Sequence, residues 1–170
     1  MKYSIMFIIM ITILNPIEYI SQDRQTYNHP YLNFNFTASE NWIKVHHPED
    51  KFIYEIMRPD SLLHVMLWYT ETEQSAEKYL VKMADMKDLA PADRKPSVSN
   101  INKKEFWMFN TSGYIGKKHV QSILAVVSHG KSLQRPKENR LYIVHIWCPE
   151  ENYSRLRNTF DEILASIQII

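Results

Sequence analysis

Unbroken apolar runs dominate the hydropathy pattern of this chain. Four segments rich in β-branched and aromatic residues lack the apolar-polar alternation of a strand with one wet face: 62–69, 104–110, 120–128 and 141–148. Such runs are typical of strands that are buried on both faces. We therefore expect these four strands at the centre of a sheet that is covered on both sides.

Two other segments carry apolar residues at the spacing of an amphipathic helix. One follows Ser75, a residue type that caps helix N-termini, and has Glu77 in its first turn. Its apolar stripe consists of Ala76, Tyr79, Leu80 and Met83, and Met86 can extend it. The second helix follows Pro149, and its stripe consists of Tyr153, Leu156, Phe160, Ile163, Leu164 and Ile167.

Together these elements predict an α+β fold. The links at 112–117 and 129–139 are short, which favours antiparallel neighbours. Because both faces of the central strands need cover, and two amphipathic helices can supply it, we expect a three-layer α/β/α sandwich with a central, mainly antiparallel sheet. Since no repeat or linker divides the sequence, we expect a single domain over residues 22–170.

The segment ahead of the central strands predicts shorter elements. Residues 31–36 alternate apolar and polar side chains, as a half-buried strand does. A turn at 39–41 and a returning strand at 42–45 then predict a hairpin. Residues 52–57 predict one more strand, whereas the polar segment 23–30 predicts only an extended lead-in.

The N-terminal segment has the features of a secretory signal. Lys2 precedes an apolar run at 5–14, and Pro16 breaks that run, which is shorter than the roughly 20 residues of a membrane span. We expect residues 1–21 to be a signal peptide and the protein to be exported, either periplasmic or secreted. The alternative is an apolar N-terminal element packed on the domain. The single cysteine, Cys148, is far from this segment, so we expect no lipoprotein, and membrane contact only through the N-terminus.

Composition narrows the function classes further. The chain has 170 residues and a formal net charge of +1, with acidic and basic residues interspersed. This balance gives no reason to expect a nucleic-acid partner. One cysteine permits no internal disulfide, and three glycines exclude a glycine-rich loop that cradles phosphates. We expect no cofactor.

The order of the elements resembles the PsbP-like family, which includes DcrB-type periplasmic proteins and a Ran-binding nuclear-import cofactor. The residues that carry the resemblance lie between about residues 32 and 168: Phe34-Asn35-Phe36, Ser39-Glu40-Asn41-Trp42-Ile43, Ile146-Trp147, Tyr153, Phe160, Ile163 and Ala165-Ser166-Ile167. The resemblance implies an α/β/α sandwich and, for exported bacterial members, a non-enzymatic accessory or binding role. The family shares no catalytic signature, so the resemblance implies no functional residue.

One polar turn groups imidazoles with carboxylates. His46, His47, Glu49 and Asp50 are residue types that bind zinc and other divalent metals. Adjacent histidines on an extended chain point in opposite directions, so they rarely bind one ion together. We expect a solvated turn and no metal site. The same turn, with Trp42 at the mouth of a site, is our candidate for binding a small ligand.

Two mid-strand histidines and the cysteine are the remaining candidates for chemistry. His64 and His145 lie in apolar surroundings, where either can be a core residue or a base paired with a carboxylate. Cys148 lies three positions after His145, and on a strand these two side chains face opposite sides. We therefore expect a buried structural thiol rather than a nucleophile.

Basic residues gather in the segment before the last strand. Our candidates for a patch that binds a protein partner are Lys131, Arg135 and Lys137, with Arg140 beside them and Lys117-Lys118 in another turn; the alternative is solubilising charge on these loops. With no catalytic constellation in view, we expect an exported, non-catalytic accessory or binding protein that holds a protein partner. The alternative is a small-ligand or metal-binding periplasmic protein, and an enzyme using His64 or His145 ranks third.

Overall fold

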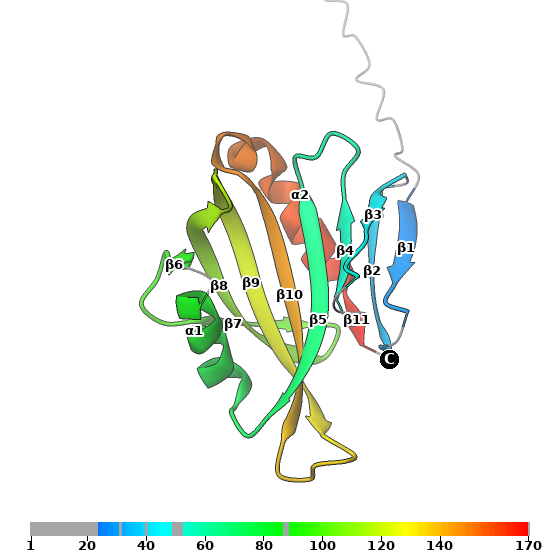
Figure 1. Cartoon of the computed structure of the whole chain (residues 1–170), viewed down its shortest axis with the longest axis vertical. Coiled ribbons are helices and arrows are strands. Elements are labelled where there is room, and N and C mark those ends of the chain that lie inside the picture. Colours follow the sequence, from blue (N-terminus) through cyan, green and yellow to red (C-terminus); the bar gives the residue numbers. More distant parts are fainter. Residues whose placement is uncertain (1–23, 31, 40, 49–52, 87–88, 170) are drawn as a thin grey trace, which may run out of the picture.

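The computed structural model describes residues 24–30, 32–39, 41–48, 53–86 and 89–169 (Figure 1). The chain has an α+β fold of mainly antiparallel sheets with two helices in the described part. The strands are β1 (Arg24–Asn28), β2 (Phe34–Ser39), β3 (Ile43–Val45), β4 (Tyr54–Met57), β5 (His64–Thr72), β6 (Leu89–Pro91), β7 (Ser97–Ile101), β8 (Lys104–Ile115), β9 (Lys118–Lys131), β10 (Asn139–Pro149) and β11 (Gln168–Ile169). The helices are α1 (Ala76–Met86) and α2 (Tyr153–Ser166), the latter preceded by a 3-10 turn, η1 (Glu150–Asn152).

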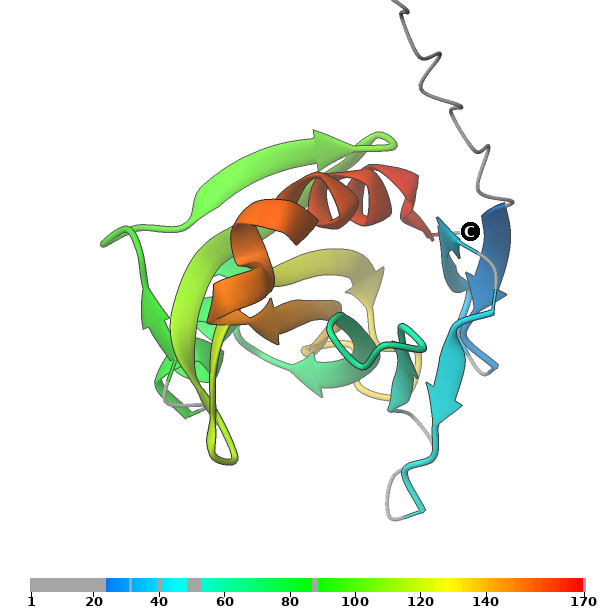
Figure 2. The ribbon, with the colours of Figure 1, turned by 90° about the horizontal axis from the view of Figure 1, so that it is seen from above.

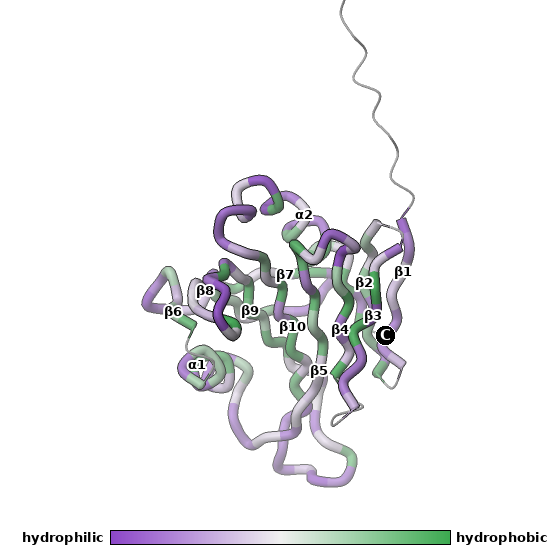
Figure 3. The backbone as a smooth tube through the Cα atoms, turned by 45° about the horizontal axis from the view of Figure 1, so that its top comes forward, coloured by the Kyte–Doolittle hydropathy of each residue, from purple (hydrophilic) through white to green (hydrophobic). Residues whose placement is uncertain are grey.

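The described strands form two sheets. The larger sheet has eight strands in the order β3-β4-β5-β10-β9-β8-β6, with β7 also paired to β8, and the smaller has the order β1-β2-β11. The four apolar runs form β5, β8, β9 and β10. These strands are neighbours in the sheet, in the order β5-β10-β9-β8, as predicted. Figure 3 shows hydrophobic residues along these central strands and hydrophilic ones on β1 and in the loop between β9 and β10.

Alternate residues of β10 enter two separate cores, as a strand buried on both faces requires. Tyr142, Val144, Ile146 and Cys148 pack in one cluster with the apolar stripe of α2, which is Leu156, Phe160, Ile163 and Leu164. Phe34 and Phe36 of the small sheet complete this core. The small sheet therefore shares the α2 face of the large sheet, a feature that the sequence pattern did not predict.

The opposite face of the large sheet carries the second core. Leu141 and Ile143 of β10 pack there with Leu80 and Met83 of α1. Both helices form where their periodicity predicted them, and they pack on opposite faces of the large sheet. Figure 2 shows α2 lying along one side of that sheet.

The hairpin expected from 31–36 and 42–45 does not form, and that prediction was wrong. β2 pairs with β1 and β11, whereas β3 pairs with β4 in the other sheet. Asn41 adopts a left-handed conformation with φ of 70°. The Tyr27 hydroxyl accepts a hydrogen bond from the backbone N–H of Trp42 and donates one to the carbonyl of Ser39, each at 3.1 Å. This bridge redirects the chain from the small sheet to the large one.

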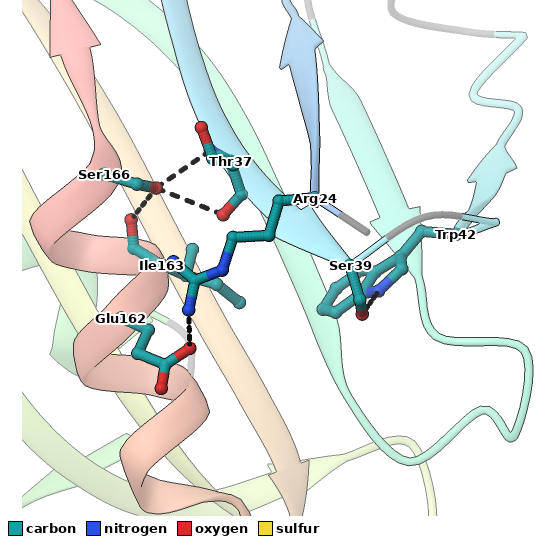
Figure 4. Close-up of polar contacts among 7 residues, drawn as sticks. All are labelled: Arg24, Thr37, Ser39, Trp42, Glu162, Ile163 and Ser166. Atoms are coloured by element: carbon teal, nitrogen blue, oxygen red, sulfur yellow. Dashed lines mark hydrogen bonds and ion pairs between the residues drawn. The ribbon is translucent and has the colours of Figure 1, made fainter. Parts of the chain in front are cut away.

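Polar contacts fasten the C-terminal part of α2 to the small sheet (Figure 4). The Ser166 hydroxyl accepts a hydrogen bond from the backbone N–H of Thr37 at 2.8 Å, and its own hydrogen faces the carbonyl of Ile163 at 2.7 Å. Arg24 of β1 forms an ion pair with Glu162 at 2.7 Å. The polar lead-in at 23–30 is thus partly a strand, β1, which is held by its pairing and not by its own hydrophobicity.

Candidate functional site

The α1 face of the large sheet is covered only in part. A helix of 11 residues is about 16 Å long, whereas β10, also of 11 residues, extends for about 37 Å. The helix covers Leu141 and Ile143, while His145 and Trp147 continue the same row beyond it. The end of this face that lies beyond the α1 contacts is the candidate site.

A cleft of about 390 Å³ lies at this end. Its size falls within the roughly 300–1,000 Å³ range of small-molecule sites. The lining is mostly apolar and aromatic, and it comes from strands β4, β5, β6, β8 and β10: Glu55, Met66, Leu89, Tyr114, Ile115, His145 and Trp147. Such a lining, with a few polar groups, is typical of sites that bind apolar ligands.

Glu55 supplies the one carboxylate among the described residues of this lining, and its side chain is only 7% exposed. His64 Nδ1 donates a hydrogen bond to one carboxylate oxygen at 2.7 Å, and His47 Nε2 donates to the other at 2.8 Å. Burial by itself would raise the pKa of Glu55, but the hydrogen bonds from His64 and His47, together with the charge of these rings, hold that pKa below its ordinary value of 4.5. Glu55 is therefore ionised at neutral pH.

His64 is held in place by an aromatic neighbour as well as by Glu55. Its ring stacks on the indole of Trp147, with ring centroids 3.7 Å apart and planes 10° from parallel. These two residues face each other across the pairing of β5 with β10. The stack fixes the imidazole, which in turn orients the Glu55 carboxylate at the cleft.

Comparisons with known proteins concern the fold. No model of a protein family matches the sequence, and no curated protein matches it. Among solved structures, the cyanobacterial PsbP (CyanoP) of Synechocystis sp. PCC 6803 superimposes with a TM-score of 0.61 at 11% identity, over 88% of this chain and 94% of that one. This chain has a PsbP-like fold. The prediction drawn from the resemblance is confirmed at the level of the fold.

Two further structures are similar to this PsbP-like chain. A protein from Bacteroides thetaiotaomicron has a TM-score of 0.53 at 10% identity, over 86% of this chain and 48% of that one. The Ran-binding protein Mog1p of Saccharomyces cerevisiae has a TM-score of 0.49 at 8% identity, over 88% and 96% of the two chains.

His145 and Cys148 point to opposite faces of the PsbP-like sheet, as the strand geometry predicted. His145 lines the cleft, whereas Cys148 is fully buried in the core beneath α2. Burial, reinforced by the charge of Glu151, raises the pKa of the Cys148 thiol to about 11. The prediction that the Cys148 thiol is buried is therefore confirmed.

The structure separates the residues of the predicted ligand turn. Trp42 is 8% exposed and belongs to the α2 core, where its indole N–H donates to Ser39 Oγ at 2.8 Å. His46 is exposed, and His47 turns toward Glu55. Glu49 and Asp50 lie outside the described residues. Among the residues that the structure describes, no group of three or more acidic, histidine or cysteine side chains is arranged to hold a metal ion.

The predicted basic patch lies on one projecting hairpin. Lys131 at the end of β9 is exposed, as are Arg135 and Lys137 on the loop between β9 and β10, and this hairpin extends beyond the body of the sheet (Figure 1). The Arg135 guanidinium forms an ion pair with Glu138 at 3.3 Å. The other basic turn, at 117–118, lies at the opposite end of β9, so the two turns do not share one patch.

Glu55 is the site residue that the sequence reasoning missed. It lies within the strand predicted at 52–57, between the buried residues Tyr54 and Ile56. An acidic residue flanked by two apolar residues on a short strand was the available signal, because a buried carboxylate needs a partner. Its partner His64 was itself singled out, but only the pairing of β4 with β5 brings the two together.

Proposed function

We propose that this protein is an exported, non-catalytic binding protein whose cleft on the α1 face holds a small apolar ligand. The observation that carries the proposal is the cleft of about 390 Å³ with mostly apolar walls, which lies on the α1 face of the sheet beyond the residues that α1 contacts. Met66, Leu89, Ile115 and Trp147 are the apolar residues of its walls. Burying such surface under a ligand is favourable at about 25 cal/mol per Å².

A non-catalytic role is supported by how the polar groups are used. Both oxygens of Glu55 already accept hydrogen bonds from imidazoles, so the carboxylate is positioned as part of the fold. The Cys148 thiol is protonated at neutral pH and lies on the other face of the sheet. These arrangements favour holding a ligand over transforming one.

Thermal unfolding of the full chain with graded concentrations of hexanol, octanol and cyclohexanol tests ligand binding. A ligand at 100 times its dissociation constant stabilises the protein by about 2.7 kcal/mol, so a saturable rise in melting temperature is expected. Ile115→Trp fills the cleft and should abolish the rise. The matched control is Val98→Trp on β7, an exposed position outside the cleft, which should preserve it. If no ligand gives a saturable rise, the proposal is wrong.

Binding of a protein partner is a second candidate function, and one observation favours it. Leu133 is 88% exposed on the β9–β10 hairpin, among the basic residues Lys131, Arg135 and Lys137. Protein interfaces combine an apolar centre with a polar rim, and Leu133 with these basic residues has that arrangement. Cross-linking in the source cells should yield an adduct that Leu133→Ser weakens and Ile115→Trp does not. If Leu133→Ser leaves the yield of the adduct unchanged, the hairpin surface around Leu133 is not the docking site.

The proposal of export rests on the N-terminal pattern of a charged residue, an apolar run and a helix breaker. Residues 1–21 lie outside the described residues, and no helix in the described part is long and apolar enough to cross a membrane. N-terminal sequencing of the protein from cell fractions tests export: cleavage near residue 21 supports it, and an intact Met1 in the cytosol contradicts it.

We also infer that the large sheet is the middle of a three-layer α/β/α sandwich; the two separate cores under α1 and α2 support this.

A further inference from the structure

The charge of the cleft restricts the ligands it can take. Among the described residues that line the cleft, Glu55 is the only one with a full negative charge, and none of the other six is a lysine or arginine. The carboxylate is 5% exposed at the residue level, so water screens it poorly. A ligand bound here therefore meets the Glu55 carboxylate, which holds the imidazoles of His64 and His47 on its two oxygens, among mostly apolar walls.

The carboxylate keeps unused capacity to accept hydrogen bonds. An ionised carboxylate offers about four lone-pair sites, and His64 and His47 occupy one on each oxygen. The hydrogen bonds from these two rings keep the pKa of Glu55 low, so it stays ionised without a ligand. An ammonium group carries three donors and a compensating charge, which suits this acceptor.

The aromatic residues at the cleft favour the same ligand charge. Trp147 and Tyr114 both line the cleft, and Tyr114 is 63% exposed at its rim. The faces of indole and phenol rings attract cations, and because His64 stacks on one face of Trp147, only the other indole face and the Tyr114 ring can serve a ligand. An anionic ligand would instead face Glu55 at close range in a poorly screened site, which costs free energy.

We propose that the cleft binds an amine: a molecule that joins an apolar chain or ring to a positively charged ammonium group, with the ammonium on the Glu55 carboxylate. This inference rests on the proposed ligand-binding function and names the ligand class. The apolar part lies against Met66, Leu89 and Ile115. A volume of about 390 Å³ equals that of about a dozen water molecules, so the ligand is small.

Calorimetric titration of the full chain with hexylamine, hexanol and hexanoate at neutral pH tests the ligand class. These probes share one chain length and differ in the charge of the head group. Hexylamine is expected to bind at least about tenfold more tightly than hexanol, because one charge-assisted hydrogen bond supplies a difference of that size. Hexanoate is expected to bind most weakly. Glu55→Gln should bring hexylamine to the affinity of hexanol. The matched control Glu162→Gln removes the same charge from an exposed position on α2 and should change nothing.

A second variant covers the case in which Glu55→Gln fails to fold. Ile115→Lys places a tethered ammonium at the cleft wall, at a partly exposed position. It should abolish hexylamine binding and favour hexanoate. Equal binding of all three probes, unaffected by either substitution in the cleft, overturns the amine assignment and leaves the proposed function standing. If hexanol and the amine both fail to bind the unaltered chain, the proposed function fails with it.

Discussion

The pairing of Glu55 with His64 should be among the strongest single polar interactions in this protein. The two side chains are 7% and 11% exposed, and the hydrogen bond between them is 2.7 Å long. A hydrogen bond to a charged group contributes about 1.5–3 kcal/mol net, because the partners exchange water for each other. We therefore expect a coupling free energy of about 1.5–3 kcal/mol between positions 55 and 64.

A double-mutant cycle isolates that coupling. Glu55→Leu and His64→Leu are made singly and together, and urea unfolding gives the free energy of each variant. The stack of His64 on Trp147 is lost in both variants that lack His64, so it cancels from the coupling. With a urea dependence of about 2 kcal/mol per M, a loss of 2 kcal/mol moves the unfolding midpoint by about 1 M. Such a shift is easily measured.

An exposed ion pair supplies the matched control. Arg24 and Glu162 are also 2.7 Å apart, but their side chains are 57% and 58% exposed, so their coupling should be only about 0–1 kcal/mol. The Glu55 pKa is lowered on folding, so its contribution is present above 4.5 and is lost as the pH falls through the folded pKa below that value. A coupling at neutral pH no larger than that of the exposed pair, or one that survives full protonation of Glu55, would refute this account of the cleft.

The remaining predictions concern the two cores, the thiol and one turn. Phe160→Ala should cost about 3–5 kcal/mol and Leu80→Ala about 2–5 kcal/mol in urea unfolding, since both side chains are fully buried on opposite faces of the sheet. Cys148 should resist Ellman's reagent at about pH 8 in the native state, where about one thiol in a thousand is ionised, and react once urea unfolds the chain. Gly130→Ala should cost about 1–2 kcal/mol in the same urea assay, because φ is +81° there while the added Cβ meets no neighbour.

The sequence predicted elements well where hydrophobicity alone decides them. The central strands and both helices have apolar patterns that no other packing satisfies, and they formed as expected. β1 shows the limit: four of its five residues are exposed, and it is a strand because β2 offers a partner. The hairpin at the turn 39–41 was wrongly predicted for a similar reason. The hydroxyl that redirects the chain there belongs to Tyr27 of β1, the strand that pairs with β2.

The candidate site depends on strand register, which a sequence alone does not provide. The observed register pairs Glu55 with Met66, and Met66 with His145, so these side chains and the flanking His64 and Trp147 share one face. A slip of one residue between β4 and β5 would exchange the faces and put the Glu55 carboxylate into the core under α2. Burial of apolar neighbours on that core face therefore selects the register that brings the carboxylate, the imidazoles and the indole together. The same packing that stabilises the sheet thus assembles the cleft.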